Sequence, residues 1–169
     1  MNQPAALDVD QSLDPRSVTA ARLVGIIGTT AVSLPALGGV LFAAVAAPWN
    51  EAAKLGLFGI WALFTLVAAV LIYAWPEARY RRTRYRVDER GLTIRRGVVW
   101  RSETFVPRSR VQHTDVLQGP LQRSFELATL IVHTAGTQDA SVSLGGLAYR
   151  DALPIRDLLI GDRGDDDSV

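Results

Sequence analysis

The sequence predicts a membrane α-hairpin of two transmembrane helices, followed by an all-β barrel or sandwich that a C-terminal helix caps. Two long apolar runs without charge stand in the first half of the chain, and a cluster of arginines follows the second run. Short alternating segments between turn residues fill most of the remaining chain. The 169 residues leave room for a membrane unit and one domain of about 80–90 residues.

The two apolar runs cover about residues 23–47 and about residues 55–75, and neither holds a charged residue. As a helix the first run rises about 37 Å, against a hydrocarbon core of about 30 Å. The short connection, residues 48–54, predicts that the spans lie antiparallel as one hairpin over residues 21–76. The apolar core of a signal peptide is shorter, about 7–15 residues. Two tandem runs of bilayer length also argue against buried helices of a soluble protein.

Five arginines follow the second span closely, whereas the only positive charge of the connecting loop, Lys54, is offset by the negative charge of Glu51. The positive-inside rule therefore predicts that both termini lie in the cytoplasm. The same arginines are candidates for contact with the anionic inner leaflet, and the alternative is that they act only as a topology signal. If this segment is extended, Arg82, Arg84 and Arg86 would share one face. The candidate lipid-contact residues are Arg79, Arg81, Arg82, Arg84 and Arg86.

Residues 1–20 and 162–169 are expected to be tails. The first stretch is polar and contains Asp8, Asp10 and Asp14, which is typical of a disordered segment. The second stretch is acidic and follows Gly161, so it is expected to be solvated.

The domain expected over residues 77–161 consists of short strands and one helix. Alternating or β-branched segments between Gly, Pro and Asp turns predict strands at 83–87, 92–94, 98–106, 111–117, 128–134 and 140–144. Ala148, Ala152, Ile155 and Leu159 fall on one face of a helix. Pro154 within that pattern predicts a kink or a late start of the helix.

Three motifs follow one another within residues 106–136: a Pro-x-x-Arg-Val-Gln strand, a Gly-Pro-Leu-x-Arg turn and a His-Thr-Ala-Gly turn. In this order, behind two membrane helices, they resemble the bacterial pleckstrin-homology (PH) domain family in its YdbS-like branch, over about residues 20–160. The resemblance implies that two motif arginines hold loops to the barrel by hydrogen bonds, and that Glu126 stands where a glycine is usual. If that glycine has a positive φ, the turn at Glu126 is strained or rebuilt. The motif residues with implied structural roles are Pro107, Arg110, Gln112, Gly119, Pro120, Arg123 and Gly136.

No catalytic residue, cofactor or metal site is predicted. The chain has no cysteine and two histidines. His113 and Asp115 share a strand face, but no nucleophile elbow, metal-ligand spacing or glycine-rich phosphate loop accompanies them. Membrane tethering and a net charge of +1 argue against a nucleic-acid partner. Further arginines could form a second basic surface, and Arg95 and Arg96 lie at an early turn, as the inositol-phosphate ligands of eukaryotic PH domains do. Bacteria generally lack those lipids, and fold likeness is no evidence of function.

The sequence therefore favours a non-catalytic binding or scaffold module in the bacterial plasma membrane, in a multi-pass protein. The hairpin would hold the domain at the inner leaflet, with other membrane proteins as partners, among them related PH-domain proteins or further copies of this chain. Two alternatives stay open. One is a sensor of anionic lipid that uses the juxtamembrane arginines, and the other is an accessory subunit of a larger membrane complex, which the resemblance connects with envelope stress.

Overall fold

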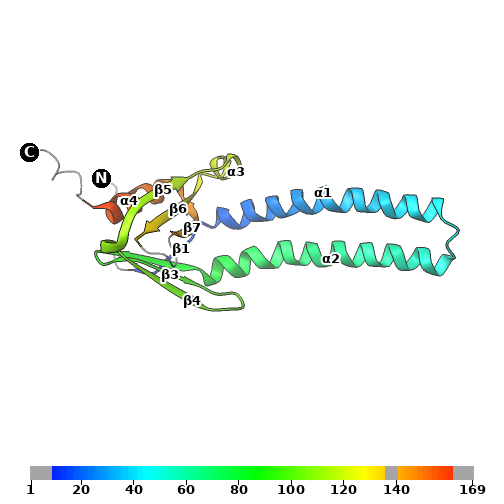
Figure 1. Cartoon of the computed structure of the whole chain (residues 1–169), viewed down its shortest axis with the longest axis horizontal. Coiled ribbons are helices and arrows are strands. Elements are labelled where there is room, and N and C mark those ends of the chain that lie inside the picture. The colour runs from blue at the N-terminus through cyan, green and yellow to red at the C-terminus, as the bar shows by residue number, and fades with distance from the viewer. Residues whose placement is uncertain (1–8, 136–140, 162–169) are drawn as a thin grey trace, which may run out of the picture. The chain divides into compact units, whose positions relative to one another are not determined.

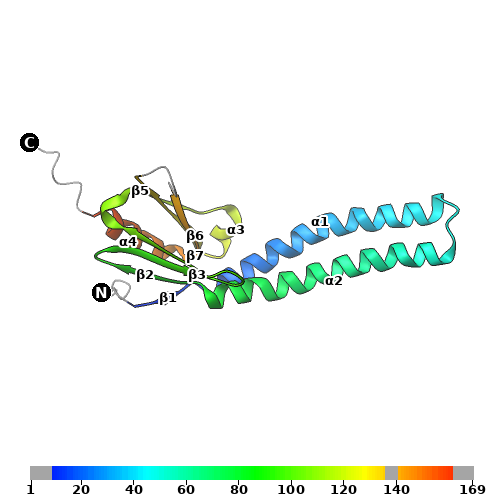
Figure 2. The same ribbon diagram turned by 60° about the horizontal axis from the view of Figure 1, so that its bottom comes forward.

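A computed structural model of the chain describes residues 9–135 and 141–161 (Figures 1 and 2). The chain divides into two compact units. The hairpin unit contains residues Ala21–Glu77, and the β-domain unit contains the residues up to Ala20 together with those from Ala78 onward.

Helices α1 (Arg16–Ala46) and α2 (Glu51–Arg82) form the hairpin, and both are long and apolar enough to cross a bilayer. Gly25 allows the two helices to approach closely, because a Cβ there would lie 2.9 Å from two side-chain carbons of Ile72. Further along, Trp61 Nε1 donates to the Ser33 carbonyl at 3.2 Å, and the Ser33 and Thr65 hydroxyls are 3.2 Å apart. These contacts set the register of α1 against α2.

The β domain is a sandwich of two antiparallel sheets. The first sheet has the order β1-β2-β3-β4 and the second has the order β5-β6-β7. The strands are β1 (Gln11–Ser12), β2 (Arg84–Asp88), β3 (Gly91–Arg96), β4 (Ser102–Pro107), β5 (Val111–Leu117), β6 (Leu127–Thr134) and β7 (Ser141–Ala148). Three short or terminal helices accompany them: η1 (Arg108–Arg110), α3 (Pro120–Ser124) and α4 (Tyr149–Ile160).

The core lies between the two sheets and is closed by α4. Its most buried side chains come from all three layers, namely Leu92 and Ile94, Leu130 and Leu144, and Ala152, Ile155 and Leu159. The predicted helix-capped sandwich is thus confirmed. The face of α4 that the periodicity predicts is the face that packs.

The prediction of a disordered tail through residue 20 is wrong for residues 11–20. Gln11 pairs with Tyr85 in the first sheet, and Leu13, only 7% exposed, belongs to the core. Helix α1 begins at Arg16, whose backbone N–H donates to the Asp14 carboxylate at 2.8 Å. The domain predicted for residues 77–161 therefore also contains a strand that precedes the first span. Residues 1–8 and the predicted acidic tail, 162–169, lie outside the described residues.

Two element boundaries also differ from the predictions. The strand expected from residue 98 begins at Ser102, because residues 97–101 form the turn between β3 and β4. Helix α4 begins at Tyr149 and continues through Pro154, so the late start is wrong. Pro154 removes a single donor, and the carbonyl left without its helical partner belongs to the exposed Arg150.

Candidate anion-binding pocket at the β3–β4 turn

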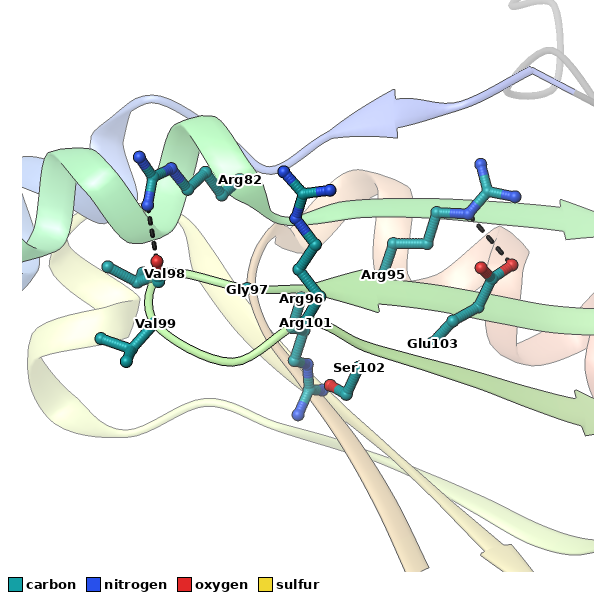
Figure 3. Close-up of a pocket in the computed structure, with 9 residues that line it drawn as sticks. All are labelled: Arg82, Arg95, Arg96, Gly97, Val98, Val99, Arg101, Ser102 and Glu103. Carbon is teal, nitrogen blue, oxygen red and sulfur yellow. Dashed lines mark hydrogen bonds and ion pairs between the residues drawn. The ribbon is translucent and has the colours of Figure 1, made fainter.

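The turn between β3 and β4 carries a pocket of about 590 Å³ (Figure 3). The register of the two strands pairs Arg96 with Ser102, and the five residues between them form the turn. Glycine suits position 97, because a Cβ there would lie only 3.0 Å from the Arg101 Cα, a tight contact. The pocket is lined by Arg82, Arg95, Arg96, Gly97, Val98, Val99, Arg101, Ser102 and Glu103.

The one carboxylate in the lining is already paired. Arg95 Nε lies 3.0 Å from Glu103 Oε1, and Arg95 also reaches Asp10 at 3.1 Å. The hydrogen bond and charge of Glu103, and then the charge of Asp10, raise the pKa of Arg95 above its ordinary value. This arginine is therefore neutralised within the protein and leaves three others in the lining.

Arg82, Arg96 and Arg101 have no carboxylate within ion-pair distance among the described residues. Arg82 donates to the Val98 carbonyl at 2.6 Å, and Arg96 donates to the Ser143 carbonyl. Partial burial, and then the positive charge of Arg79, lower the pKa of Arg96. A guanidinium stays charged at neutral pH and has five donors, so each retains N–H groups for an anion such as phosphate. In the view of Figure 3, the side chains of Arg82 and Arg96 point to one side of strands β3 and β4, and the side chain of Arg101 points to the other side.

The tip of the turn is apolar and exposed. Val99 is 71% exposed and Trp100 is 87% exposed. An exposed valine beside an exposed tryptophan is unusual on a water-facing turn, and tryptophan is typical of the membrane–water interface. The turn thus places an apolar tip next to a cationic pocket.

The structure divides the five predicted lipid-contact arginines between two elements. Arg79, Arg81 and Arg82 belong to the last turn of α2, so they are helical rather than extended, and Arg84 and Arg86 belong to β2. Arg86 is paired with Asp10 at 3.2 Å, and Arg84 donates to the Thr83 carbonyl at 3.0 Å. Only Arg82 lines the pocket.

The sequence predicts separate surfaces for Arg82 and for the arginines around residue 96. The structure brings Arg82 into one site with Arg96 and Arg101, because the turn folds its Val98 carbonyl onto the end of α2. Gly97 directly follows the last residue of β3 and marks the start of the turn. Starting the turn at this glycine would have predicted that Arg96 and Arg101 flank its tip.

The motif residues act mainly through the backbone. Pro107 ends β4 before η1, while Gly119 and Pro120 begin α3, where the Gly119 N–H donates to Gln122 Oε1 at 3.1 Å. Gln112 lies at the register shift between Val111 and His113. Within the described part of the chain, no hydrogen bond or ion pair involves the guanidinium groups of Arg110 and Arg123, so their structural side-chain contacts stay a prediction. The Arg110 carbonyl accepts from the Ala135 N–H at 3.0 Å. Gly136 lies outside the described residues.

Comparison with known proteins adds two findings. A family model described as "Bacterial PH domain" matches residues 30–163. One curated relative, the "UPF0699 transmembrane protein YdbS" of Bacillus subtilis (strain 168), is 35% identical over 103 residues, which are 60% of this chain and 61% of that protein. The chain thus spans less than two thirds of the length of this relative. No solved structure matches the chain.

Proposed function

The chain belongs to the bacterial PH domain family, and on that premise we propose that it is a membrane-anchored, non-catalytic binding module that binds the phosphate of anionic lipid headgroups at the cytoplasmic leaflet. One observation carries the proposal. Arg82, Arg96 and Arg101 line one pocket without a carboxylate partner among the described residues, directly beside the exposed Trp100.

The chemistry of the pocket suits a phosphate group. A guanidinium binds phosphate through paired N–H donors, and the pair of Arg82 and Arg96, which point to the same side, is well matched to a group that presents several oxygens. Trp100 would enter the headgroup layer while the arginines bind the phosphates above it. A lipid suits this combination better than a soluble anion, because a soluble anion gives no reason for an exposed apolar tip.

The proposed orientation has two supports. Strand β1 precedes the first span and β2 follows the second, and both belong to one sheet, so the chain must leave and return on the same side of the membrane. The arginines at the end of α2 then favour the cytoplasm as that side. A single residue, Thr83, separates α2 from β2, so the domain is tethered without a linker and gains a high local concentration at the surface.

A scaffold for other membrane proteins is the second candidate, and strand β4 favours it. In the part of the chain that is described, β4 is an edge strand of the first sheet, and its Phe105 is 52% exposed. An edge strand with an exposed aromatic side chain can pair with an extended segment of a partner. Photocrosslinking from position 105 in native membranes would identify such a partner.

The lipid proposal is tested with the full chain in nanodiscs. Replacing Trp49, Trp61 and Trp75 by Phe leaves Trp100 as the one fluorophore of its kind. In discs that contain phosphatidylglycerol, we expect Trp100 emission to shift to the blue and to be quenched by lipids brominated near the headgroup. In discs of phosphatidylcholine alone, both effects should be weaker.

Variants that remove charge test whether the pocket causes the difference in Trp100 fluorescence between the two lipids. Combining Arg82→Gln, Arg96→Gln and Arg101→Gln should abolish the difference between the two lipids, whereas Arg150→Gln, an exposed arginine on α4, should preserve it. If the triple variant keeps the full difference, the pocket does not bind headgroups. If inorganic phosphate produces the response in phosphatidylcholine discs, the ligand is a soluble anion and the lipid proposal is wrong.

A further inference from the structure

Strands β5 and β6 bring three metal-ligating side chains together on one face of the second sheet. His113 lies opposite His133 in the strand register, and Asp115, two positions after His113, shares its face. Asp115 Oδ2 lies 3.2 Å from His133 Nε2 and 4.0 Å from His113 Nε2. The ligand atoms of all three residues lie within 4.8 Å of one another.

The two imidazole rings are stacked, with centroids 4.1 Å apart and an interplanar angle of 14°. A neutral imidazole keeps a lone pair on one nitrogen, and that lone pair is what a metal ion binds. The cross-strand stack thus places two imidazole rings next to one carboxylate.

We propose that His113, Asp115 and His133 form a surface site for one divalent transition-metal ion of the zinc type, with water completing the coordination. In a tetrahedral zinc site with bonds of about 2.0–2.2 Å, ligand atoms lie roughly 3.3 Å apart. The pair of His133 and Asp115 already has that spacing. His113 Nε2, now 4.0 Å from Asp115 Oδ2, must come closer and its ring must turn out of the stack, which its side chain, 62% exposed, is free to do.

The donor set selects the class of ion. Two imidazoles and one carboxylate suit zinc, copper or nickel, whereas calcium and magnesium prefer oxygen ligands alone. A bound ion would also join β5 to β6 across their outer face, so it should stabilise the folded domain.

The composition of the chain makes the test sharp. There are two histidines and no cysteines in the whole sequence, so a site with two imidazoles has to use His113 and His133. The full chain is purified without a polyhistidine tag, reconstituted in nanodiscs and titrated with Cu²⁺. Pulsed EPR, which counts imidazole nitrogens coupled to the copper, should find two imidazoles at one ion per chain.

Variants complete the experiment. His113→Ala and His133→Ala should each leave one imidazole and weaken Zn²⁺ binding, measured by calorimetry, at least about tenfold. Asp115→Asn should keep two imidazoles with weaker binding, and Asp151→Asn on α4 should leave the affinity unchanged. Zn²⁺ should raise the melting temperature of the wild type but not that of His133→Ala. Finding fewer than two imidazoles in the wild type, or unchanged Zn²⁺ affinity in the more conservative His113→Gln, would overturn the proposal.

Discussion

Arg16 and Glu126 form an ion pair of 2.5 Å between the first turn of α1 and the turn that precedes β6, although 110 positions separate them in the chain. Among the described residues, Glu126 is the one non-glycine residue with a positive φ, 54°. Glu126 therefore has the left-handed backbone conformation that favours glycine, so the turn is strained as expected. The ion pair with Arg16 is a contact that a glycine at this position could not make.

Glu126→Gly is expected to stabilise the β domain. A left-handed conformation costs a residue with a Cβ roughly 1–2 kcal/mol, and glycine avoids this cost. The ion pair contributes little, because both side chains are more than half exposed. Urea unfolding of the full chain, followed by hydrogen–deuterium exchange of the β-domain amides, should show a higher midpoint. Glu126→Ala is the matched control: it loses the pair and keeps the strain, so its midpoint should fall, and a rise in both variants would contradict the strain.

The stability of the β domain should decrease in strong alkali because of Tyr85. This side chain is 3% exposed and donates to Gln11 Oε1 at 2.8 Å. Burial, and then the charge of Asp151, raise the pKa of Tyr85 to about 12. The unfolded chain ionises at the ordinary pKa of about 10, so the contribution is complete below that pH and is lost as the pH rises toward about 12.

Melting temperatures between pH 9 and pH 11.5 test this dependence. Tyr85→Phe lacks the hydroxyl, so it should melt lower than the wild type at pH 9 and lose less stability as the pH rises. Parallel curves for the two proteins would show that Tyr85 does not titrate with a raised pKa. The phenolate absorbance of the wild type minus that of the variant measures the pKa of Tyr85 directly.

Gly25→Val should weaken the hairpin. The added Cβ would lie 2.9 Å from Ile72 side-chain carbons, so the helices have to separate, at a cost of about 1–3 kcal/mol. Gly39→Val is the control, because a Cβ at Gly39 meets nothing within 4 Å. Helical circular dichroism on heating in one detergent should show a lower midpoint for Gly25→Val alone. Equal effects of the two substitutions would argue against a close approach at Gly25.

The orientation can be tested by cysteine labelling, because the chain has no native cysteine. Asn50→Cys lies in the exposed loop between the helices, and Ser109→Cys lies in the exposed η1 turn. An impermeant maleimide should label position 50 in intact cells and position 109 only after lysis. Labelling of position 109 alone in intact cells would reverse the proposed topology.

The parts predicted well from the sequence are those that local patterns determine. Both spans follow from uninterrupted apolar length, and the packed face of α4 follows from the spacing of Ala152, Ile155 and Leu159. Strand β1 could not be predicted in this way, since Leu13 is the single hydrophobic residue between Asp10 and Arg16, and β1 forms only by pairing with β2, which lies far along the chain.

The sites show the same division between local and long-range information. An arginine-rich, exposed turn is visible in the sequence, but the meeting of Arg82 with Arg96 depends on where α2 ends. His113 and His133 are likewise separated by a helix and a turn, and only the β5–β6 register places them opposite each other. A one-residue change of register would have put one of them on the other face of the sheet.

Pairing of β1 with β2 also determines the order in which the protein can be built. The ribosome makes Gln11 long before Tyr85, 74 positions later, and both membrane helices are synthesised in between. The first sheet therefore cannot be completed until both helices have been synthesised and β2 lies beside β1. A chain with a missing or inverted second helix would leave one edge of β2 unpaired. A chain in which β2 cannot reach β1 is therefore left with an incomplete first sheet.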